Sequence, residues 1–420
     1  MKFKKRAVFS LLSTALATGL IAGCSSGTSS SAQTLKVGVA FPVSGNLAKI
    51  GQASTNGVEI AKDLVNEQPN AKKIELVKAD TPDATAAVNE VNRLITQEKV
   101  KTIVGMYASP LVMAASEVTE RNKVVLWEVA ATDPRVTGRG YKYIFRPNPS
   151  ASGYGPTTIE YLSKVVAPKL GMEPSKMKVA ILHEDGDFGT GVTKATKEAA
   201  QKAGIPIVGE IKYNAKTTND MTSIILKLKE LNPDVLDVVQ YDTDAQLFWK
   251  QAKQLGLNVK VVIGNGAGQS SDNFGHTFGK DADGVLDTSS AMLLNKQALT
   301  PEAQKLDSEF FKRYKEKFGK EPDLIAKLAF SSSYVLFNDV LQKTGTTDPE
   351  KVRKQALSLD LPVGATPVGW GIKFGEDGQN TRAQMAVMQW QNGKLNVVYP
   401  ENFAVEKPIH IPLPAWSERK

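Results

Sequence analysis

The stretch that decides the fold is residues 101–133, KTIVGMYASPLVMAASEVTERNKVVLWEVAATD. It predicts a short strand at 102–105 and a second strand at 124–129, joined by a helix over 109–120. A serine and then a proline open this helix, and both residue types are favoured at a helix start. Strand, helix and strand in this order are typical of two parallel strands in one sheet. A turn over residues 130–134 follows the second strand.

Polar groups gather where these two strands end. Parallel neighbouring strands end at the same edge of a sheet, so Ser109 and Thr132 are expected to lie close together. Their hydroxyls, free backbone N–H groups and a helix N-terminus would then converge, and such an arrangement binds a small anion such as a carboxylate. A second interpretation needs no ligand, because Ser109 could simply cap its helix and Thr132 could simply shape a turn. The stretch by itself leaves both interpretations open.

The rest of the chain repeats this alternation of strands and helices. Before residue 149 further strands are predicted at 35–41, 73–79 and 141–145, and after residue 150 the series restarts with strands at 178–183, 205–213, 235–240 and 259–263. Beyond residue 300 the chain is mostly helical, and a final pair of strands surrounds the turn dipeptide Asn392-Gly393. We therefore predict an α/β protein with two doubly wound parallel-sheet lobes.

The amino terminus has the pattern of an export signal. Basic residues at positions 2, 4, 5 and 6 precede an apolar run over 7–22, which is short for a membrane span. The segment LIAGC, which ends at Cys24, resembles the lipobox of bacterial lipoproteins, and a Ser/Gly-rich tether follows it. The resemblance implies a signal peptide over residues 1–23, then a lipidated Cys24 and a tether over 24–33. The alternative is a chance cysteine near an ordinary cleavage site.

Composition and motif spacing exclude several classes of function. The 420 residues are 41% hydrophobic and 23% charged, and past residue 24 the lysines alternate with acids, so nucleic-acid binding is not expected. Cys24 is the only cysteine, which excludes disulfides and thiol chemistry from the exported part. The chain has three histidines, and the one cluster that could ligate a metal or serve a hydrolase is 183–187. We predict no catalytic residue, no metal and no cofactor.

The order of motifs resembles that of a known family. The pieces are LKVGVAFPVSG from residue 35, IVGMYASP from 103, AATDP from 130, RGYKYIFR from 139 and ILHEDGDFG from 181. Together with the lipobox they resemble the leucine/isoleucine/valine-binding type of ABC-transporter solute receptor, over nearly all of residues 34–400. The resemblance implies a type I periplasmic-binding fold, in which two lobes joined by three crossings close about a ligand in the cleft between them.

The resemblance also implies the course of the chain through the two lobes. Lobe 1 would hold residues 34–149 and 289–366, and lobe 2 would hold residues 150–288 and 367–420. The crossings would lie near residues 148–150, 287–291 and 364–368.

The resemblance further implies ligand contacts on lobe 1. Ser109 and Thr132 would bind the carboxylate of an amino acid through their hydroxyl and backbone N–H groups. The carbonyl of Ala130 would accept a hydrogen bond from the α-ammonium, and Tyr107 would line the side-chain pocket. This agrees with the independent prediction of an anion site at the ends of the two strands.

Aromatic residues are expected to complete the ligand pocket. The resemblance places Phe188 and Tyr241 of lobe 2 over the ligand, and with Tyr107 and Trp127 they would tolerate a flatter or aromatic acid. Glu128 is unusual at the end of a buried strand unless it is paired. It either faces the ligand or pairs with an arginine such as Arg146, and both alternatives stay open.

Two positions depart from the family pattern. A first-lobe tyrosine of the family appears as Ile50, and the glutamate that pairs with a ligand ammonium appears as Gly266. An ammonium buried without a carboxylate is costly. Therefore Glu128, Asp242 or Asp244 replaces that partner, or the ligand is not an α-amino acid.

The expected function is that of an extracytoplasmic receptor without catalytic activity. It would bind a branched-chain amino acid or a related small carboxylate or amide, and deliver it to an ABC permease with a cytoplasmic ATPase. We expect a monomer that meets the membrane only through its lipid anchor, on the outer face of the cell membrane. The alternatives are a sensor that presents its ligand to a separate signalling receptor, and a hydrolase that uses the cluster at 183–187.

Overall fold

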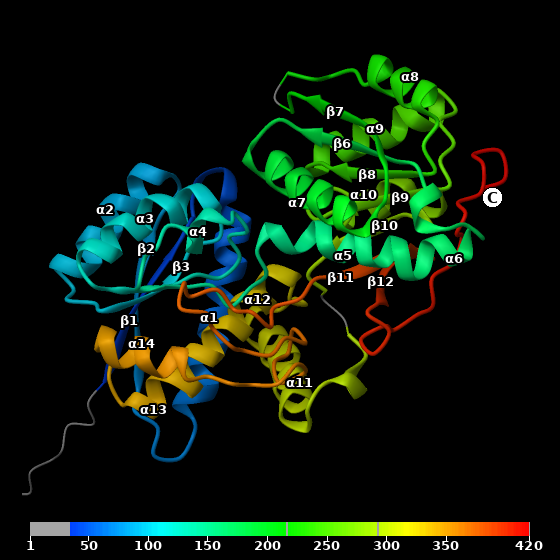
Figure 1. Cartoon of the computed structure of the whole chain (residues 1–420). Helices are drawn as coiled ribbons and strands as arrows, with labels where there is room; N and C mark the ends of the chain where they lie inside the picture. The colour runs from blue at the N-terminus through cyan, green and yellow to red at the C-terminus, as the bar shows by residue number, and fades with distance from the viewer. Residues whose placement is uncertain (1–33, 216, 292–293, 420) are drawn as a thin grey trace, which may run out of the picture. The chain divides into compact units, whose positions relative to one another are not determined.

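Two β-sheets organise the chain. The structure, a computed structural model, describes residues 34–215, 217–291 and 294–419. The first sheet has five strands in the order β2-β1-β3-β4-β5, and the second has seven in the order β12-β11-β10-β9-β8-β6-β7. Each sheet together with the helices packed on it is called a lobe below (Figure 1). The expected signal peptide, Cys24 and tether lie outside the described residues.

Lobe 1 is built on a fully parallel sheet whose strands are rich in buried β-branched residues. Val37, Val39 and Val104 are at most 1% exposed, as expected for strands covered on both faces. Its strands are β1 (Leu35–Phe41), β2 (Ile74–Asp80), β3 (Thr102–Gly105), β4 (Val125–Trp127) and β5 (Ile144–Phe145). The early helices of the lobe are α1 (Ala48–Asn66), α2 (Ala84–Thr96), α3 (Ser109–Arg121) and α4 (Arg135–Gly138).

Helices from late in the chain complete lobe 1. They share one apolar core with the first strands, and Figure 1 shows the orange helices α13 and α14 beside blue β1. This core contains a stacked pair of rings, Phe310 and Phe330, with centroids 4.4 Å apart. The late helices are α11 (Pro301–Phe318), α12 (Leu324–Tyr334), α13 (Gln342–Thr344) and α14 (Pro349–Leu357).

Helix α12 is the most apolar helix of lobe 1. With the turns that continue it to Thr344 it is long and apolar enough to cross a membrane, yet 72% of that window is buried inside the molecule. It packs closely on α1, where a Cβ atom on Gly57 would stand 2.2 Å from the carbonyl oxygen of Ala326. Its composition is therefore accounted for by its place in the core of lobe 1.

Lobe 2 carries a mixed sheet. Strands β6 to β10 are parallel, whereas β11 is antiparallel to β10 and pairs with β12 in the predicted hairpin, where Gln391 lies opposite Lys394. The predicted hairpin thus extends the parallel strands of lobe 2 at one edge of the sheet. The strands are β6 (Val179–Glu184), β7 (Ile207–Tyr213), β8 (Val235–Val239), β9 (Val261–Asn265), β10 (Leu286–Ser289), β11 (Ala386–Gln391) and β12 (Lys394–Tyr399).

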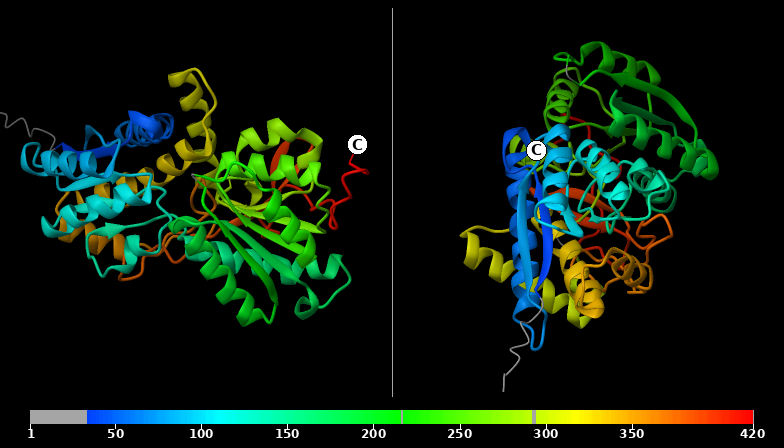
Figure 2. Two further views of the ribbon diagram at one scale, coloured as in Figure 1. Left: turned by 90° about the horizontal axis from the view of Figure 1, so that it is seen from above. Right: turned by 90° about the vertical axis from the view of Figure 1, so that its left-hand side faces the viewer.

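The helices of lobe 2 lie on both faces of this sheet. In the left view of Figure 2 the green helices surround the sheet, and the red strands β11 and β12 lie with the green elements. Helix α5 continues through a wide turn at Leu162–Val166 into α6. The helices are α5 (Tyr154–Tyr161), α6 (Ala167–Lys169), α7 (Asp187–Ala203), α8 (Thr222–Leu231), α9 (Asp242–Gln254) and α10 (Asp272–Phe278).

The third crossing lies later in the chain than the sequence indicated. Ile372 and Phe374 belong to the core of lobe 1, and the side-chain amide of Asn380 donates to the carbonyl oxygen of Pro147 at 2.8 Å. The expected boundary at residues 366/367 therefore moves toward β11. The reason is that residues 361–371 are rich in Pro and Gly, which hides the periodicity that would assign them to a core.

The C-terminal tail is packed onto lobe 2. The ring of Trp416 lies 5.0 Å from that of Trp249, and the guanidinium of Arg419 lies 3.9 Å above the Trp416 ring. The N–H of Leu413 donates to the carbonyl of Lys260 at 2.7 Å. The tail, which the sequence shows as irregular, is thus fixed by aromatic and cation–π contacts.

Candidate functional site

The lobe 1 half of the site lies where β3 and β4 end. Val104 and Trp127 are opposite each other in these neighbouring strands, so the segments that follow share one edge of the sheet. The backbone N–H of Asp133 donates to Oγ of Ser109 at 3.2 Å. The predicted proximity of Ser109 to the turn that holds Thr132 is therefore confirmed.

Ser109 does not cap its helix. Helix α3 begins at Ser109, the cap position belongs to Ala108, and no side chain caps this end. The Ser109 hydroxyl accepts from Asp133, so its own hydrogen is available to donate. The N–H groups of the first helical turn point the same way, where the helix dipole favours a negative charge. The interpretation of Ser109 as only a cap is therefore wrong.

Thr132 connects the site to the first crossing between the lobes. Its carbonyl oxygen accepts from the N–H of Ala151 at 2.7 Å and from the hydroxyl of Ser150 at 3.5 Å. Ala130 and Thr132 are both half-buried at the sheet edge. The turn that carries them is thus held by residues that lead directly into lobe 2.

Glu128 supports this turn from below. Its carboxylate accepts from the N–H of Ala131 at 2.6 Å, and its side chain is fully buried. Burial raises the pKa of Glu128 to about 8, against the opposing charge of Arg146. Arg146 itself donates to the carbonyl oxygens of Ala131 and Asp133, at 3.2 and 2.7 Å. The two side chains therefore hold the backbone of the turn from both ends.

Trp127 is a core residue of lobe 1. It is fully buried, its ring stacks on Phe145 at 5.6 Å, and it meets the edge of Phe374 at 5.3 Å. Its indole N–H donates to the carbonyl of Ser332 at 3.0 Å. These contacts account for the whole side chain, so the expectation that Trp127 contacts the ligand lacks structural support.

The lobe 2 half of the site is an aromatic wall. Gly266 directly follows β9, Tyr241 lies two residues after β8, and Phe188 lies in the first turn of α7 after β6. Strands β9, β8 and β6 are neighbours in the sheet. The rings of Phe188 and Tyr241 lie 5.5 Å apart, and Tyr154 meets Phe188 edge-on at 6.2 Å. Sequence reasoning missed Tyr154, and its one available signal was its place directly after the first crossing.

Tyr154 takes the place that a side chain at position 266 would need. A Cβ atom on Gly266 would stand 2.9 Å from the Tyr154 hydroxyl, and the φ of Gly266 is +67°, which favours glycine. Asp287 lies in the layer beneath, fully buried, and accepts from the Gly266 N–H at 3.3 Å. Burial raises the pKa of Asp287 well above its ordinary value.

Arg135 joins the two halves of the site. Burial raises the pKa of Tyr241 to about 12, and the nearby charge of Glu184 adds to it. Arg135 of lobe 1 forms ion pairs with Asp133 at 2.5 Å and with Asp187 of lobe 2 at 2.9 Å. The predicted ligand residues Ser109, Ala130, Thr132, Tyr107, Phe188, Tyr241 and Gly266 all lie in segments that follow strands of the two sheets, and their contact with a ligand stays a prediction.

Comparison with known proteins places this arrangement in a family. The sequence profile of the family described as "Periplasmic binding protein" matches residues 34–394. The chain belongs to the periplasmic binding protein family. A Leu/Ile/Val-binding protein homolog from Brucella abortus is 37% identical over 379 residues, which are 89% of this chain and 92% of the relative.

Solved structures show the same fold. The branched-chain amino acid transporter binding protein LivJ from Streptococcus pneumoniae, in complex with isoleucine, has a TM-score of 0.70 at 24% identity and covers 88% of this chain and 100% of its own. A solute-binding protein from Rhodopseudomonas palustris, in complex with a dihydroxybenzoic acid, has a TM-score of 0.69 at 24% identity, covering 90% and 99%. The predicted family and type I periplasmic-binding fold are confirmed, and the family comprises binding proteins rather than enzymes.

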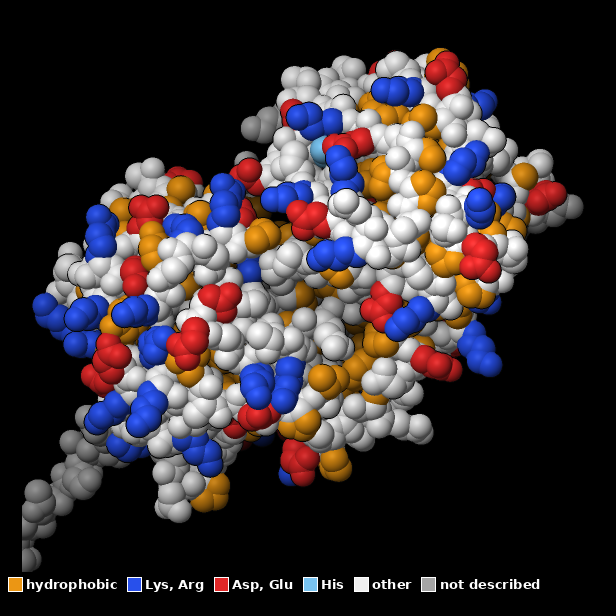
Figure 3. All heavy atoms as spheres, viewed as in Figure 1, with side chains coloured by type: hydrophobic (Ala, Val, Ile, Leu, Met, Phe, Trp, Pro, Cys, Tyr) orange, Lys and Arg blue, Asp and Glu red, His pale blue; other side chains and the backbone are white. Residues whose placement is uncertain are grey.

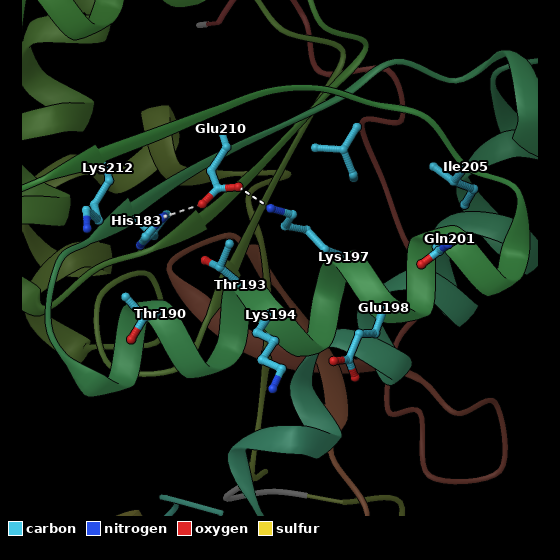
Figure 4. A pocket seen from close by; sticks show the side chains of 11 residues that line it. His183, Thr190, Thr193, Lys194, Lys197, Glu198, Gln201, Ile205, Glu210 and Lys212 are labelled. Atoms are coloured by element: carbon cyan, nitrogen blue, oxygen red, sulfur yellow. Dashed lines mark hydrogen bonds and ion pairs between the residues drawn. The ribbon is translucent and has the colours of Figure 1, made fainter.

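The cluster around His183 lies on the outer side of lobe 2 in this periplasmic binding protein. Figure 4 shows His183 and Glu210 facing each other beside α7, in a hollow lined by several lysines. Nε2 of His183 is 3.3 Å from the Glu210 carboxylate, which also pairs with Lys197 at 2.6 Å. Among the described residues no three His, Cys, Asp or Glu side chains gather as metal ligands would.

Proposed function

We propose that this periplasmic binding protein is the extracytoplasmic solute receptor of an ABC importer. It binds a branched-chain amino acid or a related small carboxylate or amide between its lobes and delivers it to the permease and its ATPase. The observation that carries the proposal is the convergence of Ser109, the α3 N-terminus and the turn of Thr132 at one sheet edge. These groups suit a carboxylate, and charge-assisted hydrogen bonds in a desolvated cleft are strong.

The relatives support the class of solute. The Brucella relatives carry the description Leu/Ile/Val-binding protein homolog, and the solved neighbours hold isoleucine in one case and an aromatic acid in another. All of these solutes present one carboxylate, which is the group that lobe 1 is equipped to bind. In the proposal, ligand acts by population shift: it favours the closed arrangement of the lobes, which the permease recognises.

The test is a calorimetric titration of the chain from Ser25 onward, freed of co-purified solute by unfolding and refolding. The probes are leucine, isoleucine, valine and the corresponding acids without an amino group. We expect Ser109→Ala to weaken binding of the best probe about ten-fold or more, because a hydrogen bond to a charged group is lost. The exposed Ser308→Ala variant is the matched control. Unchanged binding by Ser109→Ala, or no binding of any probe, would count against the proposal.

We further propose that Cys24 carries a lipid and holds a monomeric receptor on the outer face of the cell membrane. The lipobox and the Ser/Gly tether support this. In cells that process lipoproteins, Cys24→Ser is expected to move the protein from the membrane fraction to the soluble one. Fractionation followed by immunoblotting measures this, with a Ser26→Ala variant as control. Membrane retention of the Cys24→Ser protein would contradict the anchor.

A further inference from the structure

A chain of buried polar side chains runs along the edge of the lobe 2 sheet that carries the aromatic wall. Asp244, in the first turn of α9, accepts from the N–H of Tyr241 at 3.3 Å and from the hydroxyl of Tyr213 at 2.8 Å. The Tyr213 oxygen accepts from Nε2 of Gln240 at 3.4 Å, and Oε1 of Gln240 accepts from Nε2 of Gln269 at 2.9 Å. The chain thus joins the ends of β7 and β8 to the loop that follows β9.

The direction of each hydrogen bond in this chain is fixed from the Asp244 end. Asp244 accepts from a backbone N–H and from a phenol, so Tyr213 donates to it and must accept from the next residue. Each amide then donates through its nitrogen toward Asp244, and its oxygen must accept from the other side. The last oxygen, Oε1 of Gln269, is buried and has no donor among the described residues. The chain therefore lacks one proton at this end.

Asp287 of β10 lies where this proton is missing. A Cβ atom on Gly264 would stand 2.5 Å from Oδ2 of Asp287 and 2.8 Å from Oε1 of Gln269, so both oxygens converge on one point. In the described part of the chain Oδ2 has no partner either. Two acceptor oxygens in a dry site repel each other, and one proton between them satisfies both. The Ser270 hydroxyl also acts on the Asp287 carboxyl group, but its single proton can serve only one of the two oxygens.

The surroundings of Asp287 favour the protonated form. The side chain is fully buried, and this burial raises its pKa well above the ordinary value. The charge of Asp237 raises this pKa further, whereas hydrogen bonds from Gly266 and Ser270 lower it. None of these groups is a cation that would hold Asp287 as an anion.

We infer that Asp287 carries a proton on Oδ2, donates a hydrogen bond to Gln269, and thereby positions both the start of α9 and the loop over residues 266–271, called the Gly266 loop. It is a positioning residue, because its Oδ1 accepts from the Gly266 N–H at 3.3 Å while the chain ends at the backbone of Tyr241. Its effect on solute binding rests on the proposed function, in which Gly266 and Tyr241 line the cleft.

Infrared spectroscopy tests for the proton. The C=O band of a protonated carboxylic acid is separate from that of a carboxylate. In the refolded, solute-free chain at neutral pH, we expect one such band that the Asp287→Asn variant lacks. Glu128 and Asp237 are present in both proteins, so their bands cancel in the difference spectrum. If no band is lost, Asp287 is ionised, as it would be if a buried water served both oxygens, and the inference is overturned.

Calorimetry with the best-binding probe tests the positioning role. Asp287→Asn should keep the affinity within about two-fold, because the amide can donate to Gln269 and still accept from Gly266. Asp287→Leu, of similar volume but without a polar group, should weaken binding about ten-fold or more. Thr288→Val is the matched control, because it removes a buried hydroxyl from the same strand but outside the chain, and it should bind as the unmodified protein does. If Asp287→Leu does not fold, Gln269→Met replaces it, because it breaks the chain at the next link.

The outcomes separate this inference from the proposed function. If Asp287→Asn loses about ten-fold or more in affinity, binding needs an ionised carboxylate at this position, and the inference is overturned while the receptor stands. Unchanged binding by the variant that breaks the chain would equally overturn it. If no probe binds to any of the proteins, the proposed function is wrong, and hydrogen exchange of the Gly266 loop decides the inference. Faster exchange in Asp287→Leu than in Asp287→Asn supports it, and equal rates overturn it.

Discussion

Glu128 shows how one buried carboxyl can fix a binding turn. One oxygen of its carboxyl group accepts from the N–H of Ala131, while Arg146 donates to the carbonyl oxygens of Ala131 and Asp133. Because the side chain is fully buried, its charged form is disfavoured and its pKa is raised to about 8. The shape of the turn that carries Thr132 thus depends on a buried side chain beneath it.

Glu128 makes stability depend on pH. The folded protein keeps the Glu128 proton up to about pH 8 and the unfolded chain releases it near its ordinary pKa of 4.5, so this stability is present at low pH and lost as pH rises through 8. Glu128→Gln should reduce the fall in unfolding free energy between about pH 5 and pH 8 by on the order of 3 kcal/mol. Urea denaturation at the two pH values measures it.

The control for this prediction is the exposed Glu316→Gln variant, which should follow the unmodified protein at both pH values. Burial raises the pKa of Asp237 to about 7. Because Asp237 is present in every variant, part of the fall in unfolding free energy with pH remains in all of them. If the unfolding free energy of Glu128→Gln fell with pH as much as that of the unmodified protein, Glu128 would not be protonated in the folded state.

At the level of single residues, the proximity of Ser109 to the turn of Thr132 could be predicted, whereas the position of Tyr154 against Phe188 could not. The first follows from a local rule, because consecutive parallel strands end at one edge. Tyr154 comes from the first helix after a crossing, and its position against Gly266 depends on how two distant segments pack. The burial of Trp127 could likewise not be predicted from the sequence, because its partner Phe374 lies far along the chain.

At the level of elements, most strands and helices could be predicted because each carries its own period or turn signal. Strand β2 was expected at residues 73–79 and is found at Ile74–Asp80, and the hairpin of β11 and β12 follows from its Asn-Gly turn. The periodicity of a helix shows that one face is buried, but it does not say against which partner. That is why the close approach of α1 to α12 at Gly57 required the structure.

At the level of the whole molecule, an exposed ion pair connects the two lobes. On the face shown in Figure 3, positive and negative side chains are interspersed. The ion pair of Arg135 with Asp187 joins the lobes, with both side chains more than half exposed. An exposed pair contributes little by itself and is screened by salt. We propose that it biases the lobes toward the closed arrangement.

The Arg135→Ala variant tests this bias. Without the bridge, the ligand-free protein should have a larger radius of gyration by small-angle scattering at about 0.05 M salt, and the difference should shrink at about 0.5 M salt. The Lys315→Ala variant, which removes an ion pair within lobe 1, is the matched control. Equal radii for both variants and the unmodified protein at low salt would exclude a role for this pair in closure.

The packed tail shows where fluorescent labels can be attached to this periplasmic binding protein. The chain enters lobe 1 through β1 and ends against lobe 2, where Trp249, Trp416 and Arg419 hold the last residues. A fluorophore fused at the carboxyl end would therefore follow lobe 2, while one placed just before β1 would follow lobe 1. The two chain ends are natural attachment points for an energy-transfer sensor, with no insertion into either sheet.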